Sequence, residues 1–356
     1  MLYKPDCKHF RGDVPCKPHK LYGVHCENCE WFEKREGRIL VIKLGAIGDV
    51  IRTSVLLEPL RKQYPNYSVW WLSNTPEIVP STVEKRMKFS PENLLCVEET
   101  TFDVAINLDK DLHACALMSR VKATVKHGYT LADGLPAPVN DRAQHKFITG
   151  IFDDVSKNNT KSYPQEMMEI CGFEYTRQEY QIDPPGEPPF SMPQSGIVVG
   201  FNTGCGERWL TREWTEENWI ELITLVQKSG FHAVLLGGKA EHDRNIRIQQ
   251  KTGAIYNGTY PLKEFCAIVN KCHIVVTAVT MAMHIVLALR KQLVLMNNIF
   301  NPYEFELYGR GVIVEPPREC TCYFQQECTN PEYRCMDTLP SQTLYDAIMQ
   351  RVPYIG

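Results

Sequence analysis

Short hydrophobic runs alternate along this chain with segments in which hydrophobic residues recur at helical spacing. Ile39–Ile42 is an apolar run typical of a strand buried on both faces. Gly45 and Gly48 follow and allow a tight turn with close backbone approach. Beyond Asp49, apolar residues recur at helical spacing up to Leu60. We therefore predict a strand, a glycine turn and a helix whose N-terminus presents free backbone N–H groups.

The same alternation continues on both sides of a proline-rich stretch. Strands are predicted at 68–72, 102–108, 197–201, 232–236, 273–277 and 293–296, and helices at 112–121, 163–171, 215–229, 241–251, 262–271 and 281–289. Pro184–Pro193 contains five prolines in ten residues and cannot join a helix or a central strand, so we predict a linker there. The strand at 293–296 is expected to close the second sheet.

Strands that alternate with helices favour parallel sheets covered on both faces. We therefore predict an α/β protein of the GT-B type, with two Rossmann-like parallel-sheet domains that face a cleft. The expected parts are a Cys-rich segment at 1–37, an N-terminal domain at 38–184, the linker at 185–194, a C-terminal domain at 195–340 with a Cys-rich tail at 320–335, and a helix or tail at 341–356.

Composition narrows the class of protein. The 356 residues suffice for two ordinary domains, and the net charge of −3 offers no basic field for nucleic acid and no polybasic membrane patch. The N-terminal residues lack an apolar signal segment, and no run reaches the roughly 18 apolar residues of a spanning helix. We expect a cytoplasmic protein with no transmembrane segment. The sequence leaves open whether it forms oligomers or associates peripherally with a membrane.

The 14 cysteines are unevenly distributed. Four lie near the N-terminus (Cys7, Cys16, Cys26 and Cys29) and four in the tail (Cys320, Cys322, Cys328 and Cys335). Without an export signal, clustered cysteines favour a metal over disulfides. Four thiolates on one zinc or iron would fill a tetrahedral shell, so each such site is expected to be structural. Reduced, metal-free loops, or one site shared by both ends of the chain, stay open as alternatives.

Two aspartates lie where strands are predicted to end. Asp49 follows the glycine turn, where either a helix cap or a catalytic base would lie. Asp109 comes directly after the strand at 102–108, at the edge where open α/β sheets bind ligands. The alternative is that Asp109, Lys110 and Asp111 cap and solvate the following helix.

Four patches carry a family resemblance. They are ILVIKLGAIGDVIRTSVLLEPLRKQYP at 39–65, Asn202–Trp219, Leu236–Asp243, and Val275–Ile285 with the later CTCYF and RCM of the tail. In this order they resemble the lipopolysaccharide heptosyltransferases of glycosyltransferase family nine, which take ADP-heptose as donor. The resemblance runs from about Arg38 to the C-terminus.

The resemblance implies an inverting transfer of heptose or a related sugar, from an ADP-linked or other nucleotide-sugar, to a hydroxyl of a glycan, lipopolysaccharide or protein acceptor. Such a transfer needs a base and positive partners for the departing diphosphate, and no catalytic metal is expected. By resemblance Asp49 is the base and Asp109 the second candidate. The implied donor-binding residues are Gly48, Thr203, Arg212, Glu241, Thr280 and His284.

Simpler interpretations compete with three of these assignments. Arg212 could be a surface residue at the start of a helix, and its planar fork could instead clamp a diphosphate. Glu241 could be an ordinary first-turn acid rather than a partner of ribose hydroxyls. His284 could be a core histidine rather than a phosphate donor.

The chain departs from the family pattern at two positions. Relatives carry Gly-Asp-Thr where this chain has Ala278-Val279-Thr280, and a lysine where it has Arg212. Valine cannot accept a hydrogen bond, so a donor other than ADP-heptose stays open. Two rival functions also stay open: a catalytically impaired nucleotide-binding relative that acts as an assembly subunit, and a metal- or redox-sensing protein built around the cysteines.

Overall fold

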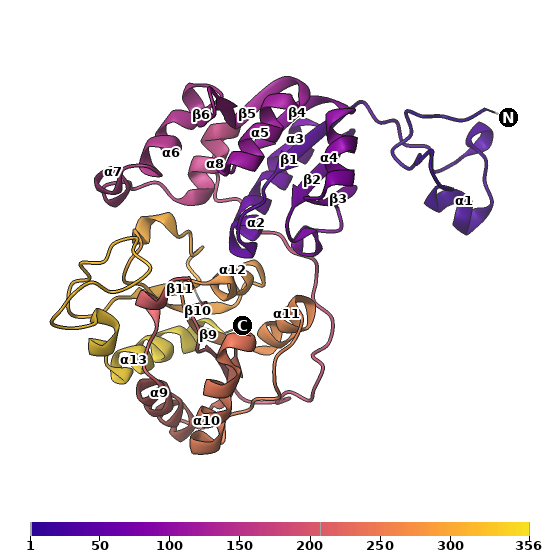
Figure 1. Ribbon diagram of the computed structural model, residues 1–356. Coiled ribbons are helices and arrows are strands. Elements are labelled where there is room, and N and C mark those ends of the chain that lie inside the picture. The colour runs from indigo at the N-terminus through magenta and orange to yellow at the C-terminus, as the bar shows by residue number, and fades with distance from the viewer. Residues whose placement is uncertain (1, 207, 356) are drawn as a thin grey trace. The chain divides into compact units, whose positions relative to one another are not determined.

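A computed structural model of the chain describes residues 2–206 and 208–355. The described residues form two compact units (Figure 1). Unit 1 comprises the residues up to Gly45, Val55–Phe147 and Met167–Gln178. Unit 2 comprises Ala46–Ser54, Ile148–Glu166 and the residues from Glu179 onward. The domain boundaries that we expected from the sequence remain predictions.

Unit 1 is built on a sheet with the strand order β3-β2-β1-β4-β5-β6. The strands are β1 (Gly37–Ile42), β2 (Tyr67–Ser73), β3 (Lys85–Lys88), β4 (Thr101–Asn107), β5 (Lys122–Ala132) and β6 (Leu135–Pro138). All neighbours are parallel except β5 and β6, which form a hairpin. Asp133 and Gly134 at its turn both have positive φ, as a two-residue hairpin turn requires.

The predicted apolar run lies at the centre of this sheet. The helices that contribute residues to unit 1 are α1 (Lys17–Tyr22), α3 (Leu57–Gln63), α4 (Pro91–Glu98), α5 (Leu112–Arg120), α6 (Gln144–Thr149) and α8 (Tyr163–Cys171). Ile39–Ile42 in β1 are fully buried between the parallel neighbours β2 and β4. The prediction of a strand buried on both faces is therefore confirmed.

Unit 2 contains an all-parallel sheet with the order β11-β10-β9-β7-β8. Its strands are β7 (Val198–Asn202), β8 (His232–Leu236), β9 (Ile274–Ala278), β10 (Gln292–Met296) and β11 (Gly311–Val314). Its helices are α2 (Ile47–Thr53), α7 (Asp153–Lys157), α9 (Glu216–Lys228), α10 (His242–Thr252), α11 (Leu262–Lys271), α12 (Met281–Ala288) and α13 (Ser341–Arg351). Every residue of β7, β9 and β10 is buried, as strands covered on both faces require.

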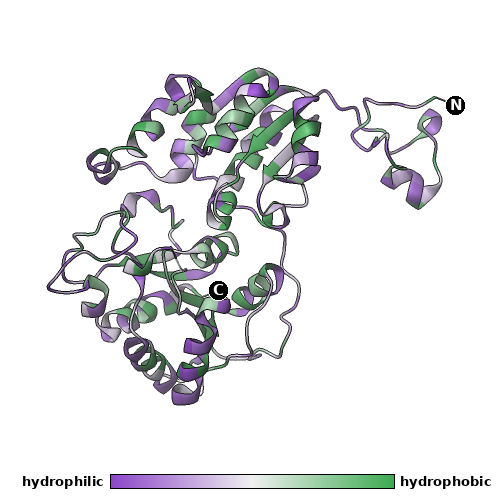
Figure 2. Ribbon diagram, viewed as in Figure 1, coloured by the Kyte–Doolittle hydropathy of each residue, from purple (hydrophilic) through white to green (hydrophobic). Residues whose placement is uncertain are grey.

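A hydrophobic core of unit 2 lies between its sheet and helices α9, α10 and α13 (Figure 1). Trp219, Leu222, Ile223 and Val226 form the buried face of α9, at helical spacing. Trp214 meets Trp219 edge to face at 4.9 Å. In the hydropathy view this apolar sheet contrasts with the polar outer faces of the helices (Figure 2).

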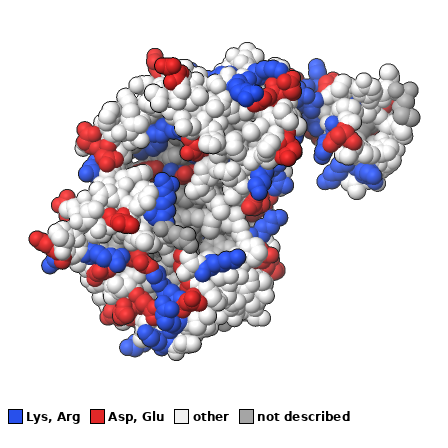
Figure 3. Space-filling view, in the orientation of Figure 1, with Lys and Arg blue, Asp and Glu red and all other residues white. Residues whose placement is uncertain are grey.

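Short 3-10 turns complete the described structure, at Cys26–Asn28, Ser54–Leu56, Pro76–Ile78, Asp141–Ala143, Leu210–Arg212, Lys239–Glu241, Pro302–Glu304, Cys335–Thr338 and Val352–Tyr354. Residues 184–193 contain neither helix nor strand, which confirms the predicted absence of regular structure there. Acidic and basic side chains are mixed over the face in view (Figure 3), in keeping with the small net charge.

Two sequence predictions are wrong in detail. The strand at 293–296 does not close the second sheet, because β11 pairs in parallel outside β10. The helix expected beyond Asp49 is interrupted at Ser54–Leu56. Pro59 has no N–H to give to the carbonyl four residues earlier, and Ser54 Oγ donates to Ile51 O at 2.5 Å.

Burial on α9 gives a direct test of this core. Leu222 is fully buried and Leu225, on the same helix, is partly exposed. Leu222→Ala should lower the free energy of unfolding of unit 2 by about 2–5 kcal/mol. Leu225→Ala, the matched control, should cost less than half as much. Urea unfolding followed by circular dichroism measures both, and equal losses would show that α9 buries a different face.

Candidate functional site

A cavity of about 740 Å³ opens in unit 2. Its volume lies within the roughly 300–1,000 Å³ typical of small-molecule sites. Asn202 ends β7, Gly237 follows β8 and Val279 follows β9, and all three line the cavity. Open α/β sheets bind ligands at these carboxyl ends. Further lining residues include Gly48, Asp49, Arg52, Gly204, Trp209, Arg212, Glu241, Tyr260, Thr280, His284, Phe300, Glu304 and Phe324.

Hydrogen bonds between strand ends shape the floor of the cavity. Asn202 Nδ2 donates to Thr277 Oγ1 at 3.0 Å and to Thr280 Oγ1 at 3.3 Å. Thr280 is the N-cap of α12, because its hydroxyl accepts from the Ala282 N–H at 3.2 Å. The first turn of α12 therefore starts at the cavity wall, where N–H groups and the helix dipole favour an anion.

Arg212 is a buried cation on this wall. Its guanidinium donates to the carbonyls of Cys205 and Trp209. Among the residues that the structure describes it forms no ion pair with an acid. Burial lowers the pKa of Arg212 to about 10, so it stays charged at neutral pH. Arg212 is 7% exposed, so its interpretation as a surface residue is wrong.

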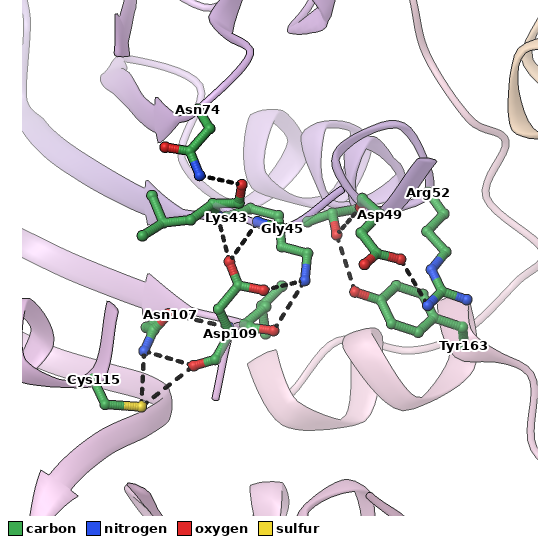
Figure 4. Close-up of polar contacts among 12 residues, drawn as sticks. Lys43, Gly45, Asp49, Arg52, Asn74, Asn107, Asp109, Cys115 and Tyr163 are labelled. Atoms are coloured by element: carbon green, nitrogen blue, oxygen red, sulfur yellow. Dashed lines mark hydrogen bonds and ion pairs between the residues drawn. The ribbon is translucent and has the colours of Figure 1, made fainter. Parts of the chain in front are cut away.

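Asp49 lies in the first turn of α2, and its side chain faces Arg52 (Figure 4). Asp49 Oδ1 is 2.8 Å from Arg52 Nη2, and Arg52 Nη1 is 2.9 Å from Glu304 Oε1. The Arg52 guanidinium also stacks 3.5 Å above the Tyr163 ring. Burial opposes the charge of Arg52, but Asp49 and Glu304 outweigh it and raise its pKa. Ala46 is the N-cap, so Asp49 is not a helix cap.

His284 on α12 packs against Gly48 on α2. A Cβ at position 48 would lie 2.5 Å from His284 Cδ2, so only glycine fits there. Burial, with a smaller contribution from Arg52, lowers the pKa of His284 to about 3, so the ring is neutral. Its Nδ1 has no hydrogen-bond partner among the described residues. His284 is therefore buried as a core histidine would be, but one ring nitrogen is unsatisfied and the residue lines the cavity.

Two other predicted donor-binding residues differ in position. Glu241 lines the cavity, and its Oε2 accepts from the Gly238 N–H at 2.8 Å, so it also caps the turn. Its side chain covers Gly204 so closely that a Cβ there would clash. Thr203 is buried and is not among the cavity-lining residues. Its hydroxyl donates to Asn245 Oδ1 at 2.6 Å. Thr203 thus supports the loop from behind.

Asp109 belongs to unit 1, where it holds the end of β1 (Figure 4). Its buried carboxylate pairs with Lys43 and accepts from the N–H groups of Leu44 and Gly45, the latter at 3.1 Å. Of the three residues in the capping alternative, it is Asp111, not Asp109, that lies at the N-cap of α5. A carboxylate occupied in this way is suited to fixing the turn between β1 and α2.

An aromatic cluster that sequence reasoning missed forms another part of the cavity wall. Trp209, Phe300 and Phe324 meet edge to face in pairs, with ring centroids 5.3–5.8 Å apart. The Arg212 guanidinium lies 5.6 Å from the centre of the Phe300 ring. Arg52 was also missed, although its spacing three residues after Asp49 on a predicted helix was a usable signal. No local sequence pattern indicates that Phe300, Glu304 or Phe324 lines the cavity.

The tail cysteines lie close behind this wall. Cys322 Sγ is 3.6 Å from Cys328 Sγ, and Cys320 donates to Cys335, which lowers the pKa of the Cys335 thiol to about 6. Asn298 Nδ2 donates to Cys335 Sγ at 3.4 Å. Across residues 2–206 and 208–355, no three His, Cys, Asp or Glu side chains stand as a ready metal-ligand set. The predicted metal sites therefore remain predictions.

The sequence matches the family model described as glycosyltransferase family 9 (heptosyltransferase) over residues 96–334. The chain belongs to glycosyltransferase family 9. It is therefore a glycosyltransferase, as the four sequence patches implied. A search of the curated proteins finds no match.

Solved structures agree in fold. A family 9 glycosyltransferase from Veillonella parvula DSM 2008 is 15% identical, with a TM-score of 0.66 over 91% of this chain and 99% of that chain. E. coli heptosyltransferase WaaC with ADP-2-deoxy-2-fluoro heptose is 17% identical, with a TM-score of 0.61 over 88% and 100%. Iron-containing dodecameric TibC from enterotoxigenic E. coli is 11% identical, with a TM-score of 0.58 over 91% and 78%. The predicted GT-B fold is thereby confirmed.

In the part of the chain that the structure describes, no helix has both the length and the apolar character needed to cross a bilayer. The cytoplasmic location expected from the sequence remains a prediction.

The buried histidine gives a pH prediction. The pKa of His284 in the folded protein lies below its ordinary value of 6.5, so the unfolded chain binds the proton first. The stability that the neutral ring contributes is complete above pH 6.5 and is lost as the pH falls toward 3, by up to ~1.4 kcal/mol per pH unit.

His284→Gln should therefore show a shallower fall in unfolding free energy between pH 6.5 and 4 than the unmodified protein. Urea titrations at several pH values measure this slope. His232→Gln, at an exposed position, is the control and should retain the original slope. An unchanged slope in His284→Gln would mean that the ring is protonated in the folded state.

Proposed function

We propose that this family 9 enzyme transfers heptose or a related sugar from an ADP-linked donor, with inversion, to a hydroxyl of a cell-surface glycan, lipopolysaccharide or protein acceptor. The observation that carries the proposal is one cavity in unit 2 that is lined by an aspartate, by a buried arginine with no acidic partner among the described residues, and by the first turn of a helix. The ADP-heptose analogue bound to WaaC supports the choice of donor.

The diphosphate would bind where positive charge is already in place. Arg212 offers a planar guanidinium that suits a diphosphate oxygen pair, and burial strengthens its field. The N–H groups at the start of α12, beside Thr280, would add hydrogen bonds to the same anion. Arg52 is less suited to this task because Asp49 and Glu304 already neutralise it.

The nucleoside would lie beyond the end of β8. Gly237 and Gly238 allow close approach there, and Glu241 offers carboxylate oxygens to ribose hydroxyls. Tyr260 and Phe265 supply apolar surface for a base. The sugar would then lie toward Asp49 and the aromatic cluster of Trp209, Phe300 and Phe324, whose ring faces suit the C–H groups of a sugar ring.

Asp49 would act as the base. As the acceptor oxygen attacks the anomeric carbon, its proton passes to the Asp49 carboxylate, and the bond between that carbon and the diphosphate oxygen breaks on the opposite face. Asp49 is 32% exposed, so an acceptor hydroxyl can reach it. Arg52 orients the carboxylate, and Arg212 with the α12 N-terminus would stabilise the charge on the departing ADP.

The four tail thiols would hold a structural zinc or iron. Sulfurs bound tetrahedrally at about 2.3 Å lie about 3.8 Å apart, close to the 3.6 Å between Cys322 and Cys328. The tail also supports the cavity loop, since Thr211 donates to the carbonyls of Gln325 at 3.0 Å and Gln326 at 3.3 Å. Iron in TibC supports the proposal.

Val279 favours a second candidate function, a nucleotide-binding relative without transferase activity that acts as an assembly subunit. It lines the cavity, and its side chain offers no oxygen to a donor. A screen of ADP-, UDP- and GDP-sugars separates the two candidates. Release of the nucleoside diphosphate with sugar transfer supports the enzyme, whereas binding without turnover of any donor supports the second candidate.

Asp49→Asn should lower kcat about 100-fold or more, because asparagine cannot take the proton. The Kd for ADP should change little. Glu304→Gln removes the other partner of Arg52 and leaves the base in place, so its kcat should fall less than tenfold. Rate assays with the donor found in the screen, paired with calorimetry, measure both values. Undiminished transfer by Asp49→Asn would refute the assignment of the base.

Arg212→Met should weaken ADP binding by roughly 10- to 100-fold, since a charged hydrogen-bond partner contributes about 1.5–3 kcal/mol. Arg212→Lys should recover part of the loss. Adenosine is the matched ligand, because it lacks the diphosphate and should bind both proteins equally. Calorimetry gives the four Kd values, and an equal loss for adenosine would place Arg212 away from the phosphates.

A further inference from the structure

The N-terminal segment, residues 2–36, folds with almost no hydrophobic core. Of the described residues in this segment, only Cys7 and Pro18 are buried. Leu2, Tyr3, Val14, Leu21 and Tyr22 are more than half exposed. So little buried apolar surface does not offset the conformational entropy lost by ordering the chain. Segments of this size usually need disulfides or a bound metal ion to fold.

Backbone contacts nonetheless give the segment a defined course. Cys7 bridges Lys34 in antiparallel fashion, and Lys8 N donates to Glu33 O at 2.8 Å. The two ends of the segment therefore lie side by side, directly before β1. Between them runs α1, which ends at Gly23 in the left-handed conformation (Figure 1).

Four different positions of this course each supply one thiol. Cys7 lies on the bridge, Cys16 is the N-cap of α1, Cys26 begins the 3-10 turn and Cys29 follows it. All four are free cysteines. The Cys26-x-x-Cys29 spacing allows both thiols to face one point.

These thiols surround one small cavity of about 20 Å³. Such a volume accommodates about one water-sized sphere. The other lining residues are His9, Phe10, Pro18 and Phe32, so sulfur dominates the wall together with apolar groups. Four sulfurs around a space for one atom, shielded by aromatic rings, match the surroundings of a tetrahedral thiolate site.

We propose that the N-terminal segment binds one thiolate-preferring divalent ion, zinc or iron, through Cys7, Cys16, Cys26 and Cys29. In the conformation described the thiols line the cavity without forming a ready ligand set, so binding draws them inward. The ion replaces the missing hydrophobic core, and a closed four-thiolate shell leaves no position for catalysis. This proposal is independent of the proposed sugar transfer.

His9 also lines the cavity, but it has another partner. Its Nε2 lies 3.4 Å from Glu33 Oε1, and four thiolates already complete a tetrahedral shell. His9→Ala is therefore the matched control, because it removes a potential ligand from the same cavity and should leave the ion in place.

Metal analysis of the full-length chain tests the proposal. The protein is purified under reducing conditions without chelators, and zinc and iron are measured per chain by mass spectrometry. Cys26→Ser/Cys29→Ser should lose about one ion per chain relative to the unmodified protein. His9→Ala should lose none. Cys320→Ser/Cys335→Ser, in the tail, should retain the N-terminal ion whether or not the tail holds its own.

A second readout reports folding of the segment itself. Chelation, or the Cys26→Ser/Cys29→Ser change, should make trypsin cleave after Lys20 at least tenfold faster, while circular dichroism of the α/β body stays unchanged. Equal metal content in this variant and in the unmodified protein, or no ion in the latter after reduction and addition of zinc, would overturn the proposal. Disulfides among these four cysteines, found by mass spectrometry, would also overturn it.

Discussion

The close contact between Gly48 and the His284 ring is the constraint on which the site in unit 2 depends. A Cβ at position 48 would lie 2.5 Å from His284 Cδ2, so either the buried ring or α2 would have to shift. Asp49 and Arg52 lie on the same turns of α2 and would move with it. A single missing Cβ therefore sets where the proposed base stands, and the neutral state of His284 follows from the same burial.

The two arginines that line the cavity, Arg52 and Arg212, differ in their partners and therefore in the role that we propose for each. Arg52 is bound by two carboxylates and stays in place, so it orients Asp49 instead of attracting an anion. Arg212 is held by carbonyl oxygens, which fix its direction without cancelling its charge. In a partly desolvated pocket that remaining charge would act strongly on the proposed diphosphate.

The cysteines serve parts of the chain that burial cannot stabilise alone. Near the tail, Thr211 donates hydrogen bonds to the carbonyls of Gln325 and Gln326. A disordered tail would therefore also disturb the part of the cavity wall that contains Phe324. In residues 2–36 several large apolar side chains are more than half exposed, whereas all four cysteines line the small cavity. Both arrangements place sulfur where an ordinary domain has leucine or valine.

Local spacing was enough to predict the parallel sheets and most helices, because strand and helix periodicities lie within a few residues of each other. The resemblance of four sequence patches indicated the family and singled out Asp49, Arg212 and Glu241, which line the cavity. The folded chain alone decided which partners they have. Arg52 meets Glu304 across 252 residues, and Asp109 meets Lys43 across 66. Such pairs form only when distant elements pack together, and no local pattern in the sequence encodes that packing.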